Sequence, residues 1–93
     1  MDNDYMNILI NKRKNRIWQL EKLIISMNIS SEMHKSFCAF LAEKVLQQLE
    51  KGADSKKIQG IIKSELCVGY GLYMHEFNSE KITNDIMNWW ENN

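Results

Sequence analysis

The chain has 93 residues, and its 12 basic and 12 acidic side chains leave no formal net charge at neutral pH. This length suggests one domain, residues 1–93, and an apolar fraction of 44% is too high for a disordered protein. Zero net charge excludes an overall field that attracts nucleic acid or an acidic membrane, so only local patches can do so. The sequence contains no proline, which favours long helices over a turn-rich β fold.

The sequence carries no recognisable signal for secretion or for membrane insertion. No apolar run reaches the roughly 18 residues that span a bilayer, and the acidic, polar residues 1–4 do not resemble a secretory signal. Two cysteines are too few for a disulfide framework. We therefore expect a cytoplasmic protein that does not bind membranes. The abundance of Asn, Lys and Ile is typical of AT-rich coding sequences, such as those of phages and plasmids.

The first predicted helix is the longest and covers residues 4–27. Its apolar positions step alternately by four and three residues, the period of a coiled-coil seam. The seam consists of Met6, Ile10, Ile17, Leu20, Ile24 and Met27, and is interrupted by Arg13. This helix either packs across the rest of the chain as a bundle member or forms a homodimer with a second copy. Trp18 and Ile25 lie beside the seam and widen the apolar surface, which favours an additional partner.

A basic run lies in the middle of this helix. Residues 11–16 carry four positive charges, on Lys12, Arg13, Lys14 and Arg16. Such a run is either a solvated helix face or an electrostatic footprint for nucleic acid or for an acidic protein surface. Because exposed charges contribute little without a defined geometry, the run is a candidate rim of a binding surface and not a site by itself.

The central stretch, residues 31–66, is predicted to form two antiparallel helices joined by a tight turn. Ser30 or Ser31 is placed to cap the first of them, over residues 31–51. Gly52 follows where a left-handed residue commonly ends a helix. The apolar stripe of this helix has helical spacing and consists of Met33, Phe37, Phe40, Leu41, Val45 and Leu49.

The second helix of this hairpin is expected over residues 55–66, with Asp54 or Ser55 as its cap. Its apolar face consists of Ile58, Ile61, Ile62 and Leu66. The same pair of helices fits part of a helix-turn-helix pattern. In that alternative a dimer would meet DNA through Lys56, Lys57, Gln59 and Lys63. The fit is partial, because Gln48 stands where the motif usually needs a small apolar residue.

Residues 67–77, with the sequence CVGYGLYMHEF, do not follow one pattern. Every second residue from 68 to 74 is apolar or aromatic, as in a strand, whereas Gly69 and Gly71 each lower helix propensity by about 1 kcal/mol relative to alanine. We expect an irregular or weakly helical segment. Its large side chains either pack in the core or line a binding groove, and they are Tyr70, Tyr73, Met74 and Phe77.

The last helix is predicted over residues 79–91, with Asn78 or Ser79 as its cap. It ends in two adjacent tryptophans, Trp89 and Trp90. Neighbours on a helix diverge by about 100°, so both indoles cannot face one core and at least one should be partly exposed. Because tryptophan often dominates binding energy at interfaces, this pair is a candidate surface for a partner or for a second copy.

The candidate chemistry is sparse. His34, Cys38, Cys67 and His75 are a complete ligand set for tetrahedral zinc, but their spacing matches no compact zinc motif, and buried thiols with surface histidines are the simpler interpretation. The same residues supply a Cys–His nucleophile pair without an identifiable oxyanion site. No phosphate-binding glycine loop is present. We therefore expect no catalysis, no cofactor and no metal.

Together these patterns predict an all-α bundle of about four helices around a central antiparallel hairpin. The expected function is that of a small regulatory protein, an adaptor or inhibitor, which binds another protein through helical surfaces. The predicted apolar anchors are Trp18, Trp89 and Trp90, and the predicted charged rim consists of Lys12, Arg13 and Arg16. The alternative is a dimeric helix-turn-helix DNA-binding regulator.

Overall fold

Four α-helices make up most of the chain. The structure is a computed structural model that describes the backbone of residues 2–92 and the side chains of residues 11–92. The helices are α1 (Asp2–Ser26), α2 (Lys35–Glu50), α3 (Ser55–Ser64) and α4 (Ser79–Glu91). A short π-helix, η1 (Glu65–Gly69), continues α3, and a 3-10 turn, η2 (Met74–Glu76), precedes α4. Residues 2–92 contain no β-strand, which confirms the predicted all-α bundle.

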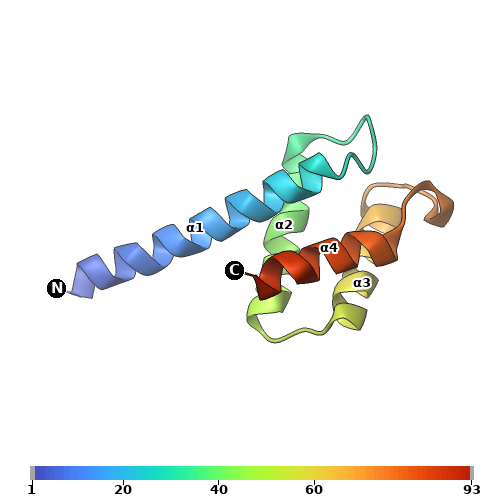
Figure 1. The fold of residues 1–93 in the computed structure, drawn as a ribbon. Coiled ribbons are helices and arrows are strands. Elements are labelled where there is room, and N and C mark those ends of the chain that lie inside the picture. The colour runs from blue at the N-terminus through green and yellow to red at the C-terminus, as the bar shows by residue number, and fades with distance from the viewer. Residues whose placement is uncertain (1, 93) are drawn as a thin grey trace.

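The helices pack in two pairs, α1 with α2 and α3 with α4 (Figure 1). With 25 residues, α1 is about 37 Å long, and its N-terminal part extends beyond the other helices in Figure 1. The molecule is therefore elongated, with extents of 51 × 26 × 20 Å. The C-terminal end of α4 reaches the middle of α1, where the indole Nε1 of Trp89 donates to Oε1 of Gln19 at 3.3 Å.

The core draws side chains from all four helices and from η1. Its large, fully buried members are Leu20, Ile24, Leu41, Val45, Leu46, Ile58, Ile62, Leu66 and Ile86. In α1 the predicted seam is therefore buried at residues 20 and 24, and residues 17 and 27 are partly buried against the core. The side chains of Met6 and Ile10, which continue the seam in the sequence, lie outside the described residues.

Three of the predicted helix ends are confirmed. Gly52 has φ +86°, and the turn after α2 closes with hydrogen bonds from its N–H to the carbonyl of Leu49 and from Ala53 N–H to that of Gln48, the two bonds of a Schellman motif. The side chain of Asp54 caps α3, and that of Asn78 caps α4. These signals are local, so they need no tertiary information.

The predicted start of α2 is wrong. The helix begins at Lys35, with His34 as its N-cap, instead of at residue 31. Ser30 does not cap it, because its hydroxyl accepts from the N–H of Glu32 and its carbonyl accepts from the N–H of Met33. This serine closes a local turn, which is the other common use of a hydroxyl next to the backbone.

The apolar stripe predicted for α2 is correct at residues 41, 45 and 49, which are buried, and wrong at Phe40, which is 51% exposed. Cys38, Ala42 and Leu46 are buried as well, so the face of α2 in the core is rotated from the predicted stripe. Both α1 and α3 contact α2 and together set the rotation of α2 about its axis. This rotation leaves Phe40 outside the buried face.

Residues 67–77 are irregular, as expected, but the helical part at their start is a π-helix. In η1 the extra residue per turn lets the N–H of Tyr70 reach the carbonyl of Glu65 at 2.9 Å. Gly71 then adopts φ +91°, which favours glycine because it has no Cβ. This geometry buries Leu66 and leaves Val68 85% exposed.

Gly60 gives a stability prediction. It lies inside α3 with helical backbone, and a Cβ added there would meet nothing within 4 Å. Since glycine costs a helix interior about 1 kcal/mol relative to alanine, Gly60→Ala should raise the free energy of unfolding by about that amount, measured by urea denaturation. Gly52→Ala is the matched control and should lower it by at least about 1 kcal/mol, because its φ is positive. Equal effects of both substitutions would contradict the assigned backbone.

Candidate functional site

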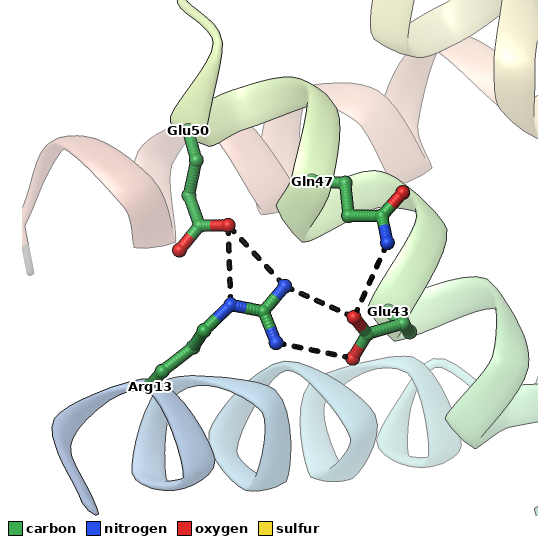
Figure 2. A network of polar contacts seen from close by, with 4 residues as sticks. All are labelled: Arg13, Glu43, Gln47 and Glu50. Carbon is green, nitrogen blue, oxygen red and sulfur yellow. Dashed lines mark hydrogen bonds and ion pairs between the residues drawn. The ribbon is translucent and has the colours of Figure 1, made fainter. Parts of the chain in front are cut away.

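Arg13, the interruption in the seam of α1, lies against α2 (Figure 2). Its guanidinium forms ion pairs with Glu43 at 2.9 Å and with Glu50 at 3.3 Å, and Gln47 donates to Glu43. The hydrogen bonding of the Arg13 guanidinium to the carboxylate of Glu43 is the largest of the effects that raise the pKa of Arg13. Two carboxylates of the same chain therefore account for an arginine at this position of the seam. The N–H donors of its guanidinium are used within the fold.

Trp89 and Trp90 lie where α4 meets α1. Both indoles are partly buried against the core, so the expectation that they cannot both be fully buried is confirmed. Their ring centroids are 6.2 Å apart. Besides the hydrogen bond from Trp89 to Gln19, the guanidinium carbon of Arg16 lies 5.2 Å from the ring centroid of Trp90. These contacts give both tryptophans a role in joining α4 to α1.

Trp18 is different, because its side chain is 57% exposed although it lies on the helix that supplies part of the core. Ile25, two turns further along α1, is 40% exposed. The ammonium of Lys22 lies 4.7 Å from the centroid of the Trp18 ring. These residues line a shallow groove of about 360 Å³ that is completed by Lys35, the first residue of α2.

Two lysines, Lys22 and Lys35, line this groove, and Lys14 precedes Trp18 by one helical turn. Lys14 and Lys22 lie about 40° to either side of Trp18 around the axis of α1, since each residue turns the helix by about 100°, and Lys35 lies on the α2 side. All three side chains are exposed, and within the described part of the chain no ion pair involves them. We call this set the Trp18 surface: Lys14, Trp18, Lys22, Ile25 and Lys35.

The predicted rim residues lie elsewhere. Lys12 is exposed but lies about 120° around the helix axis from Trp18, whereas Arg13 and Arg16 contact α2 and Trp90. The sequence showed these charges and Trp18 on the same helix. Helix periodicity alone places Lys14 and Lys22 close to Trp18 and Lys12 further round the axis. It did not show that Trp18 stays exposed, or that Lys35 from another helix lies beside it.

The residues of the helix-turn-helix alternative are split between two environments. Lys56 and Lys57 are exposed, and Lys63 is partly buried. The amide of Gln59 donates to the hydroxyl of Ser79 at 3.1 Å, so this side chain lies against the start of α4. The helix-turn-helix alternative therefore retains exposed lysines that suit phosphates. The amide of Gln59, which would hydrogen-bond to a base, already has a partner within the fold.

A second exposed apolar region involves α2 and the segment after α3. Phe40 and Val68 are largely exposed, as are Tyr73 and Met74. The half-buried ring of Phe37 links the two parts, with centroid distances of 6.1 Å to Phe40 and 4.9 Å to Tyr70. The predicted groove-lining residues of segment 67–77 thus divide between this surface and the core, where Phe77 is partly buried.

The candidate zinc ligands are not gathered into one site in the described residues. No group of three or more His, Cys, Asp or Glu side chains there has the geometry to hold a metal ion. Cys38 is buried near Ile24 and Ile25, whereas the Sγ of Cys67 lies 3.5 Å from the Sδ of Met74. Both thiols are free.

The two thiols should differ in reactivity. Burial, and then the charge of Glu21, raises the pKa of Cys38, and the thiolate is the reacting form. At a pH of about 8, a disulfide reagent should therefore modify Cys67 first, and the Cys67→Ser variant should react at least about tenfold more slowly than Cys38→Ala. The absorbance of the thiolate that the reagent releases measures both rates. Equal rates in the two variants would contradict the burial of Cys38.

In residues 2–92, no helix has both the length and the apolar content needed to cross a membrane. Comparison with protein-family models, with curated proteins and with solved structures finds no match to this chain.

Proposed function

We propose that this chain is a small regulatory protein, an adaptor or an inhibitor, that binds another protein through the Trp18 surface. The observation that carries the proposal is the 57% exposure of Trp18 on a helix whose other side is fixed in the core by Leu20 and Ile24. More than half of an indole corresponds to roughly 100 Å² of apolar area. Burying that area under a partner contributes roughly 2–3 kcal/mol.

The position of Trp18 supports binding in a second way. Its backbone is held by a helix that packs on α2, and its ring already has a neighbour in Lys22. A partner therefore does not need to order the chain before it docks, and preorganised anchors lose less entropy on binding. Tryptophan is also the residue type most enriched among the side chains that dominate interface energy.

The test compares capture of partners by the full chain and by two variants. The wild-type chain, Trp18→Ala and Val68→Ala are immobilised, and proteins captured from extracts of the source cells are identified by mass spectrometry. We expect a partner that is retained by the wild type and by Val68→Ala and is lost with Trp18→Ala. Val68 is the matched control because its apolar side chain is 85% exposed elsewhere. Capture that is unaffected by Trp18→Ala would overturn the proposal.

Self-association is a separate outcome of the same variants. If the captured partner is a second copy of the chain, light scattering should show a dimer for the wild type and a monomer for Trp18→Ala. That result would retain the Trp18 surface as the interface and would identify its occupant.

A further inference from the structure

The charges around Trp18 indicate what kind of partner fits. Two of the residues that line the groove are lysines, Lys22 and Lys35, and Lys14 lies one turn before Trp18 on the same face. Glu21 also lines the groove, but it is partly buried and lies close enough to Cys38 in α2 to raise the pKa of that thiol. The exposed edge of the groove is therefore positive, although the chain as a whole is neutral.

The apolar positions indicate the shape of the partner. Trp18 and Ile25 are seven residues apart, which places them about 10.5 Å from each other along the axis of α1. A second helix that lies along α1 presents side chains at the same interval, at positions i and i+7, with i+3 or i+4 between them. The lysines beside Trp18 then meet the flanks of that helix.

We propose that the partner segment bound by the Trp18 surface is an acidic amphipathic helix, an inference that rests on the function proposed above. Its apolar stripe covers Trp18 and Ile25, and its Asp or Glu side chains pair with Lys14, Lys22 and Lys35. Complementary charges of this kind set the choice of partner and the association rate more than they set the final affinity.

Single-stranded nucleic acid is the competing occupant, because lysines and a tryptophan also bind phosphates and stack on bases. One feature favours the helix. The second apolar position in the groove is Ile25, an aliphatic side chain with no stacking surface. Successive bases would need aromatic rings at both positions.

The first experiment selects ligands without assuming their sequence. A random peptide library displayed on phage is selected on the full chain after depletion on Trp18→Ala. We expect the recovered peptides to be enriched in Asp and Glu and to carry large apolar residues at helical intervals of three and four positions. Recovery of neutral or basic peptides, or of no peptide that depends on Trp18, would overturn the inference.

The second experiment tests the lysines with a synthetic copy of a selected peptide. The triple variant Lys14→Gln, Lys22→Gln, Lys35→Gln should weaken binding about tenfold, since each exposed pair contributes a small amount. A control triple variant, Lys51→Gln, Lys56→Gln, Lys57→Gln, removes the same charge from exposed positions outside this surface and should change the dissociation constant less than about twofold. Raising the salt from about 50 to about 500 mM should reproduce the loss for the wild type. Equal effects of both triples would contradict the inference.

Fluorescence anisotropy with labelled oligothymidylate separates the two occupants. Binding that is tighter than that of the peptide and is lost with Trp18→Ala would overturn the acidic helix in favour of nucleic acid. If a captured protein depends on Trp18 but is not displaced by the acidic peptide, only the chemistry assigned to the partner is wrong. If no captured protein depends on Trp18, the proposed function itself is wrong.

Discussion

Leu66→Ala should destabilise the protein by about 2–5 kcal/mol, whereas Val68→Ala should change its stability by less than about 0.5 kcal/mol. Both residues lie in η1, but Leu66 is fully buried and Val68 is 85% exposed. Truncating a buried leucine removes its transfer free energy and leaves a cavity. Truncating an exposed valine does neither.

Urea denaturation monitored by circular dichroism measures both effects. For a domain of this size, a loss of about 3 kcal/mol lowers the melting temperature by roughly 15 °C. The Leu66→Ala variant should therefore begin to unfold well below the melting temperature of the wild type. The pair also tests the conformation of the segment. In an extended strand, residues 66 and 68 would share one face, and the two truncations would then have similar costs.

Trp18→Ala should weaken binding of the protein partner at least about 100-fold, the effect of losing an aromatic hot spot worth about 3 kcal/mol. Trp18→Phe retains a ring and should lose about tenfold. Calorimetry with the captured partner measures both constants. Because Trp18 is 57% exposed, the stability of Trp18→Ala should stay within about 1 kcal/mol of the wild type.

Trp89→Ala is the matched comparison for this prediction. Trp89 packs against the core and donates to Gln19, so its truncation should cost about 2 kcal/mol or more in stability. Its direct effect on binding at the Trp18 surface should be small, provided that affinity is measured where the variant is folded. A reversed result, with Trp89 needed for binding and Trp18 for stability, would exchange the roles of the two residues.

Several helix ends follow from short-range chemistry and were predictable. Gly52 reaches positive φ without a steric penalty, and Asp54 and Asn78 accept from the first turns of α3 and α4. Each of these interactions spans only a few residues. The start of α2 was not predictable in the same way, because the serine beside it has more than one local hydrogen bond available, and a turn before the helix uses it.

The helical class and the order of the helices follow from the sequence alone, because an apolar repeat and a capping residue act within one element. The tertiary structure decided how each helix is rotated against its neighbours. Periodicity fixes only relative angles along one helix. It therefore placed Phe40 in the core, and it did not show that the side of α1 with Arg13 faces α2 while the side with Lys14 and Trp18 stays exposed. Only packing decides which face remains in water.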